Sequence, residues 1–163
     1  MQISEDSRVW IYQADRAFTG TEKEQIEKAL KDFTSQWEAH GFQLSADAEV
    51  RYNRFIILMV DEAQAGATGC SIDKSVRMIK DFEQQFNVNL FDRLNIAFRR
   101  GDEILSLDRD RFELEIQSGR VTEDTIVFNN LVQTKKELDN NWETPFRNSW
   151  HARVFESILA SGN

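Results

Sequence analysis

The residues best suited to chemistry lie between 61 and 77, where the only cysteine of the chain, Cys70, precedes an amphipathic pattern. This pattern predicts a helix that begins near Ser71 or Asp73. A helix N-terminus favours the thiolate, which is the nucleophilic form of cysteine. A thiol-dependent enzyme would therefore use Cys70 as nucleophile and His151 or His40 as base. In the alternative, Cys70 is a small buried residue that packs the loop.

The same stretch could bind a small anion. Free backbone N–H groups at a helix start attract phosphate and carboxylate groups, and cations one turn into the helix add positive charge. The residues that would hold such a ligand are Gly66, Gly69, Ser71, Lys74 and Arg77. In the alternative, the glycines only permit a tight turn, and the cations are solvated or pair with nearby carboxylates.

Residues of the same stretch resemble three other kinds of site. A phosphate-binding loop of the Walker type would need glycines at Thr68 and Asp73, and an aspartate places negative charge where phosphates lie. The Ser-x-x-Lys pattern at 71–74 lacks the companion motifs of serine acyl-transfer enzymes. The carboxylates between 61 and 73 could collect Mg²⁺, but carboxylates that end a strand and cap a helix need no metal. We therefore expect no metal and no cofactor.

Composition limits the class of protein. The chain has 163 residues, a net charge of −8 and 40% hydrophobic residues, which is typical of a single globular domain. Its negative charge argues against binding to nucleic acids or to anionic membranes. One cysteine leaves no partner for an internal disulfide. No apolar run approaches the length of a membrane span, and residues 1–20 lack a signal-peptide core, so we expect a cytoplasmic protein.

Hydrophobic periodicity predicts the elements that position these residues. The apolar run 55–60 indicates a strand that is buried on both faces. Thr21 and Glu24 match a capping box that opens the first helix. The predicted order is strand, helix, strand, strand, helix and strand, at 9–12, 21–41, 44–53, 55–60, 71–86 and 90–99. This βαββαβ order predicts an α+β, ferredoxin-like core with one four-stranded antiparallel sheet and two helices on one face.

The expected single domain spans 1–163, with its ferredoxin-like core at 7–100 and a C-terminal α/β extension at 101–163 packed on that core. Within the extension, Asp108 and Thr134 are favourable helix N-caps. Pro145 ends the last predicted helix, and the segment from Trp150 to Phe155 is expected to dock on the core.

Several short motifs extend over most of residues 8–155. They are the stretches 9–13, 51–56, 60–62, 69–73, 75–77, 90–93, 127–130 and 149–151. On these motifs the chain resembles a family of uncharacterised proteins from Bacteroidota, whose members often carry the label "ABC transporter ATPase". The residues do not support that label, because the chain has no usable Walker lysine loop and is short for such an ATPase domain. The resemblance implies no established activity.

The resulting hypothesis is a non-catalytic binding or regulatory domain whose ligand is a small anionic metabolite held at Gly66–Arg77. Such a module would self-associate, for example as a homodimer, through an open sheet face or edge. The alternative is the thiol-dependent enzyme with Cys70 as nucleophile.

Overall fold

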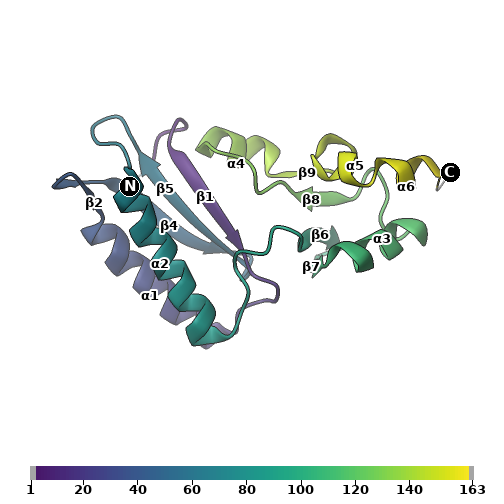
Figure 1. Ribbon diagram of the computed structural model, residues 1–163, viewed down its shortest axis with the longest axis horizontal. Coiled ribbons are helices and arrows are strands. Elements are labelled where there is room, and N and C mark those ends of the chain that lie inside the picture. Colours follow the sequence, from purple (N-terminus) through teal and green to yellow (C-terminus); the bar gives the residue numbers. More distant parts are fainter. Residues whose placement is uncertain (1–2, 162–163) are drawn as a thin grey trace.

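The strand β5 (Phe55–Asp61) lies at the centre of the first of two main antiparallel sheets in the computed structural model, which describes residues 3–161 (Figure 1). Its first six residues are all buried, as expected for a strand covered on both faces. β1 (Arg8–Gln13) and β4 (Ser45–Arg51) pair with it on either side, so that the strand order is β1-β5-β4. A tight turn at Tyr52 and Asn53 joins β4 to β5, with positive φ at both residues.

Two long helices, α1 (Gly20–Gln36) and α2 (Gly69–Phe86), cover one face of this sheet (Figure 1). Their buried apolar residues pack on alternate residues of β5, Ile56 and Leu58. Because side chains of a strand alternate between its faces, Phe55, Ile57 and Met59 point to the opposite face. A short hairpin, β2 (Glu38–Ala39) and β3 (Phe42–Gln43), follows α1.

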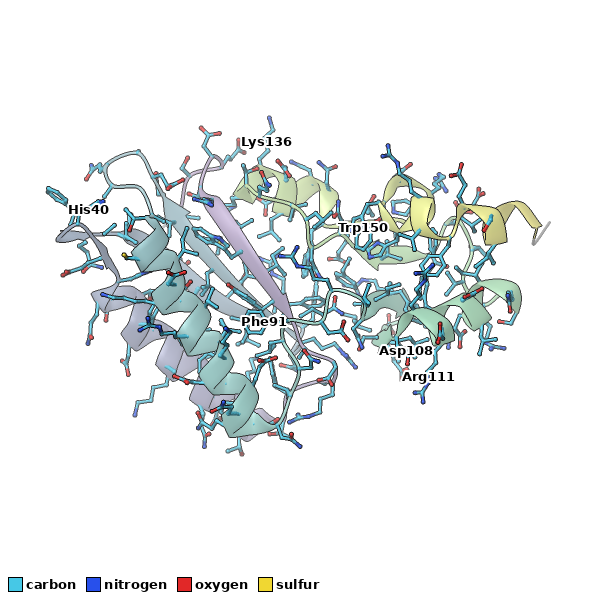
Figure 2. The ribbon with its side chains drawn as sticks, in the orientation of Figure 1. His40, Phe91, Asp108, Arg111, Lys136 and Trp150 are labelled. Carbon is cyan, nitrogen blue, oxygen red and sulfur yellow. The ribbon has the colours of Figure 1, made fainter. Side chains whose placement is uncertain are left out.

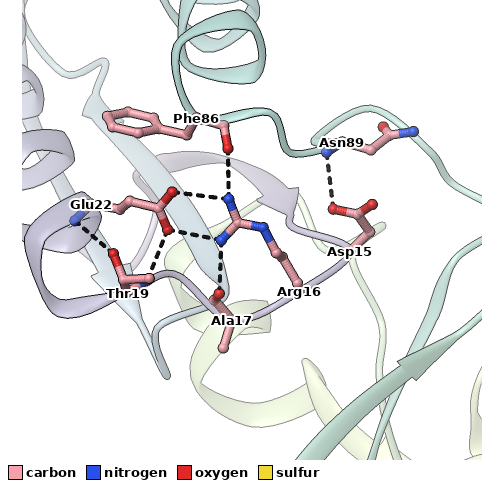
Figure 3. A network of polar contacts seen from close by, with 7 residues as sticks. All are labelled: Asp15, Arg16, Ala17, Thr19, Glu22, Phe86 and Asn89. Carbon is pink, nitrogen blue, oxygen red and sulfur yellow. Dashed lines mark hydrogen bonds and ion pairs between the residues drawn. The ribbon is translucent and has the colours of Figure 1, made fainter.

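The helix α1 begins two residues earlier than the sequence predicts. Its N-cap is Thr19 and its capping-box partner is Glu22, so the prediction that Thr21 and Glu24 form this box is wrong. Bonds of Arg16 to Glu22 favour the capping box of Thr19 and Glu22 over the similar pattern at Thr21 and Glu24 (Figure 3). The Arg16 guanidinium donates to both carboxylate oxygens of Glu22, at 2.8 and 2.9 Å, and to the carbonyl oxygen of Phe86 at 2.6 Å. These bonds tie the start of α1 to the end of α2.

A second sheet is built from β6 (Ile96–Arg100), β7 (Glu103–Leu107), β8 (Ile126–Phe128) and β9 (Glu143–Pro145), in the order β7-β6-β8-β9. The fold is thus mixed α+β with antiparallel sheets, but the four-stranded ferredoxin-like sheet is not confirmed. In that arrangement the fourth strand would lie beside β1, whereas β6 pairs with β7 and β8. The second sheet therefore joins residues from both sides of the core boundary expected at residue 100.

The strand expected at 90–99 is shorter because polar side chains turn the chain before it. Asn89 Oδ1 accepts hydrogen bonds from the N–H groups of Phe91 and Asp92, and Asp92 Oδ1 accepts one from the N–H of Leu94. Asn and Asp side chains that bond to nearby backbone in this way favour turns over strands. The extended chain consequently begins only at Ile96.

Residues of the second sheet and of α4 pack on the other face of the first sheet. Ala97, Phe128 and Trp142 pack against Phe55 and its neighbours in one buried cluster. The far side of the second sheet carries α3 (Arg109–Gln117), η1 (Phe146–Asn148), α5 (His151–Val154) and α6 (Glu156–Ser161), while α4 (Lys135–Asn141) lies near β1. The predicted caps Asp108 and Thr134 are confirmed at α3 and α4. No helix within 3–161 has the length and apolar character needed to span a bilayer.

One edge of the first sheet stays open as a result. The outer side of β1 forms a single antiparallel bridge, between Arg8 and Thr134. Beyond that bridge, no other strand of the described chain pairs with this side of β1. The open edge lies where a ferredoxin-like fold would place its fourth strand.

Candidate functional site

Two of the backbone amides at the start of α2, those of Thr68 and Ser71, bond within a capping box. The N-cap is Thr68, whose N–H donates to Ser71 Oγ at 2.7 Å, while the N–H of Ser71 donates to Thr68 Oγ1 at 3.3 Å. Ser71 is 1% exposed, and its hydroxyl also donates to the Thr68 carbonyl oxygen. Each residue of this capping box thus satisfies the other, as the capping motif requires.

The loop before α2 holds a carboxylate of its own. Glu62 Oε2 accepts a hydrogen bond of 2.9 Å from the N–H of Ala67, and a Cβ at Gly66 would lie 3.1 Å from the same oxygen. Glu62 therefore takes a position that an anionic ligand at this loop would need. Of the other predicted ligands, Gly69, Lys74 and Arg77 are exposed. The predicted anion site at Gly66–Arg77 stays a prediction.

The predicted thiol and its proposed bases lie on different elements. Cys70 is exposed in the first turn of α2, so it does not pack the loop as a buried residue. His40 is exposed in the turn between β2 and β3 (Figure 2). His151 is 4% exposed in α5. Figure 1 shows that α5 lies far from the start of α2. The structure thus does not bring Cys70 and His151 together.

A cavity of about 340 Å³ lies along the open edge of β1, between the turn at 90–95, the segment 128–131 and the start of α5. We call it the β1-edge cavity. Phe91 and Trp150, both labelled in Figure 2, lie near the junction between the first sheet and the C-terminal segments. The residues that line the cavity are Ile11, Tyr12, Gln13, Leu90, Phe91, Asp92, Arg93, Asn95, Phe128, Asn130, Leu131, Trp150 and His151.

A chain of side-chain hydrogen bonds fixes one wall of this cavity. Trp142 Nε1 donates to Asn130 Oδ1 at 2.9 Å, and Asn130 Nδ2 donates to Gln13 Oε1 at 2.8 Å. Gln13 Nε2 in turn donates to the carbonyl oxygen of Asn95 at 2.7 Å. These bonds connect β1 with the segments before β6 and after β8. The amide orientations are therefore set by the fold before any ligand binds.

Two donors at the cavity have no such partner. The indole Nε1 of Trp150 is buried and donates to no acceptor among the described residues. The exposed guanidinium of Arg93 forms neither a hydrogen bond nor an ion pair within residues 3–161. Most buried polar groups in proteins are bonded, so the unbonded indole N–H of Trp150, a residue that lines the cavity, is an exception.

His151, which lines the cavity, has a neutral ring. Burial lowers the pKa of His151 from 6.5 to about 4, so the imidazole is uncharged at neutral pH. Its Nδ1 lies 2.6 Å from Ser149 Oγ, and its ring stacks on Trp150 with centroids 3.9 Å apart. When Ser149 donates to Nδ1, the ring hydrogen is on Nε2, which can then donate to a ligand. Ser149 itself does not line the cavity.

A second and wider hollow of about 640 Å³ continues from the cavity along β1. We call it the outer groove. Both hollows include Ile11, Tyr12 and Arg93, together with Asn130 and Leu131. The outer groove adds Arg8, whose guanidinium lies 4.8 Å from the centroid of the Trp10 ring. The two hollows thus form one continuous depression over the open edge of β1.

Sequence reasoning missed most of this site. The sequence at 128–131 fits either a hairpin turn or a polar pair in a pocket, and it is the one available signal, since Asn130 does line the cavity. Gln13, Arg93 and Trp150 come from distant parts of the chain, and no local pattern joins them. Within 3–161, no group of three or more His, Cys, Asp and Glu residues is placed to hold a metal ion. No protein-family model, curated protein or solved structure matches the chain.

Proposed function

We propose that the protein is a non-catalytic cytoplasmic binding domain that holds a small organic acid in the β1-edge cavity. The observation that carries this proposal is that Trp150, whose Nε1 is buried and unbonded, lines a hollow together with the unpaired Arg93. Leaving a buried donor unbonded costs about 1–3 kcal/mol. A ligand that supplies an acceptor to this N–H would remove that cost, which would favour binding at the cavity.

The size and lining of the cavity support a small molecule with an apolar part. Its volume of about 340 Å³ falls at the lower end of the roughly 300–1,000 Å³ range of ligand pockets. Phe91, Phe128 and Trp150 offer aromatic contact to such a ligand. As in many ligand sites, the polar groups are few and lie at separate points of an apolar wall.

The free polar groups favour an acid. Trp150 Nε1 and the Arg93 guanidinium are both donors, and a neutral His151 can add a third. The one carboxylate at the cavity, Asp92, already accepts a hydrogen bond of 2.9 Å from the N–H of Leu94. Arginine binds carboxylates in a planar, two-point geometry, and this bond is stronger than one between neutral groups. The net charge of −8 disfavours long polyanions, so the acid is a small one.

The first test compares two arginines that mark the two candidate positions for an anion. Arg93 lines the β1-edge cavity and Arg77 lies on α2, and both are exposed without an ion pair in the described part of the chain. Thermal unfolding is measured with a panel of mono- and dicarboxylic acids and phosphorylated metabolites. We expect a carboxylic acid to raise the melting temperature of the wild type and of Arg77→Gln, but not of Arg93→Gln.

The reverse pattern, with the shift lost only in Arg77→Gln, would place the anion at the start of α2 instead. A broad panel that shifts neither the wild type nor the variants would contradict small-acid binding altogether. The sharpest confirmation is a ¹⁵N–¹H spectrum of the wild type, because the side-chain N–H of Trp150 has a resonance of its own and should move as the acid is added.

A further inference from the structure

We infer that the acid recognised at the open edge of β1 is the carboxyl-terminal end of a peptide, which pairs with the backbone of Ile11. This inference rests on the proposed function and specifies its ligand class. It adds two backbone groups to the side chains already described, because an amide-containing ligand can use donors and acceptors that a simple acid leaves unbonded.

The backbone of Ile11 faces away from the sheet. The N–H of Val9 donates to the carbonyl oxygen of Gln133 at 2.9 Å, on the outer side of β1, whereas the N–H of Ala14 donates to Arg54, next to β5. In an antiparallel pair, consecutive residues alternate between groups that face the partner strand and groups that face away from it. Ile11 is two residues from Val9, so its N–H and C=O also point outward.

The same edge already pairs with an extended segment at its beginning. Arg8 and Thr134 form an antiparallel bridge, and the N–H of Lys135 donates to the carbonyl oxygen of Ser7 at 2.9 Å. In the described chain, the segment before Gln133 forms no further backbone bridge with β1 and is held beside it by Asn130, whose Nδ2 donates to Gln13 Oε1. Beyond this point the edge is adjacent to the two hollows, and Ile11 lines both of them.

A peptide added at Ile11 would form two backbone hydrogen bonds with one of its residues, as in other cases where a strand is added to a sheet edge. Arg93 lies near this position, since Arg93 and Ile11 line both hollows. A free carboxylate at the end of the peptide would pair with this guanidinium. The last apolar side chain would enter the β1-edge cavity beside Phe128 and Trp150. The peptide would thus take the place of the fourth strand that the fold lacks.

The first experiment measures binding of two tetrapeptide libraries, randomised at their last two positions, one with free carboxyl ends and one with amidated ends. We expect the free-acid peptides that bind to lose about tenfold or more in affinity on amidation, as for loss of a charge-assisted hydrogen bond. Arg93→Gln should weaken the free acid by a similar factor and leave the amidated form unchanged. Arg77→Gln is the matched control and should retain the full difference between acid and amide.

The second experiment tests the backbone pairing from the side of the ligand, so that folding of the protein is not at risk. Methylation of the peptide nitrogens, one at a time, should abolish binding at the single nitrogen that donates to the Ile11 carbonyl and have little effect at the others. In ¹⁵N–¹H spectra, the Ile11 amide should move downfield and exchange more slowly with solvent when the peptide is bound. The amides of residues 66–71 should not change.

The outcomes separate the inference from the proposed function. If simple carboxylic acids bind as tightly as the peptides, or if no single methylation matters, the peptide inference is wrong and the small-acid site stands. If neither acids nor peptides change the resonances of cavity residues, both are wrong. If the Ile11 amide is protected in the free protein in a concentration-dependent manner and peptides do not compete, a second copy of the chain occupies the edge, and the inference is overturned.

Discussion

The start of α2 and the open edge of β1 contain the same kinds of groups, backbone amides with an arginine nearby, yet they differ in where those groups bond. At the start of α2, Thr68 and Ser71 satisfy each other, and Glu62 accepts from the loop amide of Ala67. At the edge of β1, the indole N–H of Trp150 is buried without a partner, and Arg93 has no ion pair in the described chain. At the start of α2 the chain thus supplies acceptors for several of its own donors, whereas at the edge of β1 these two donors have no acceptor within the described residues.

The largest predicted effect is a loss of stability at low pH, because His151 lines the cavity and is buried there. Burial lowers the pKa of its imidazole to about 4 from 6.5. The unfolded chain therefore binds a proton near pH 6.5 that the folded chain does not bind until about pH 4. The stabilisation that follows is fully present above pH 6.5, and about 3 kcal/mol of unfolding free energy is lost as the pH falls through that window.

Urea unfolding of the wild type and of His151→Gln, at about pH 7 and about pH 4.5, measures this loss of unfolding free energy. The variant should lose less stability between the two pH values than the wild type does. His40→Asn is the control, since it removes the other histidine, retains His151 and keeps a residue that tolerates the positive φ at position 40. The only charged residues among those that line the cavity are Asp92 and Arg93. Equal losses of stability in all three proteins would mean that His151 is hydrated in the folded protein and that the cavity wall is open to water.

Local patterns in the sequence were sufficient for the first sheet and its helices. β5 is a continuous apolar run that is buried on both faces. In α1 and α2 the apolar residues recur at the helical period, and burial of the resulting apolar stripe favours the helix. Helix starts were less certain, because threonines at 19 and 21 offer almost the same capping pattern. Only Arg16, which also bonds to the end of α2, decides for Thr19.

The pairing of β6 could not be predicted in the same way. Its alternation is correct for a strand, but alternation does not distinguish a pairing with β1 from the local hairpin with β7, and the pairing with β8 depends on contacts between distant residues. The hairpin of β6 and β7 needs only the short turn at Gly101, whose φ is +61°, so it closes with little loss of chain entropy. The open edge of β1, and with it the site, follows from this one pairing.

The second prediction tests whether the amides at the start of α2 are indeed occupied. Thr68→Ala removes the side-chain oxygen that accepts from Ser71 N–H, and this should lower the free energy of unfolding by about 1 kcal/mol, a usual value for an N-cap. Thr34→Ala is the control, because its hydroxyl donates within α1 at an exposed bond and should change stability by less than about 0.5 kcal/mol. Urea unfolding at neutral pH measures both. A neutral Thr68→Ala would mean that these amides do not depend on the cap, and the anion site at Gly66–Arg77 would regain support.

The smallest effect is expected at Cys70, which is exposed one residue after the start of α2. Cys70→Ser should change the unfolding free energy by no more than about 0.5 kcal/mol, as at other exposed positions. A small thiol reagent should modify Cys70 in the folded protein, at a rate that denaturant-induced unfolding does not limit. Because α5 is far from this helix turn, His151→Gln should leave that rate unchanged (Figure 1). A severalfold slower reaction in either His151→Gln or His40→Asn would instead show that this histidine activates the thiol of Cys70. The start of α2 would then be the reactive region, and the edge of β1 would have a structural role.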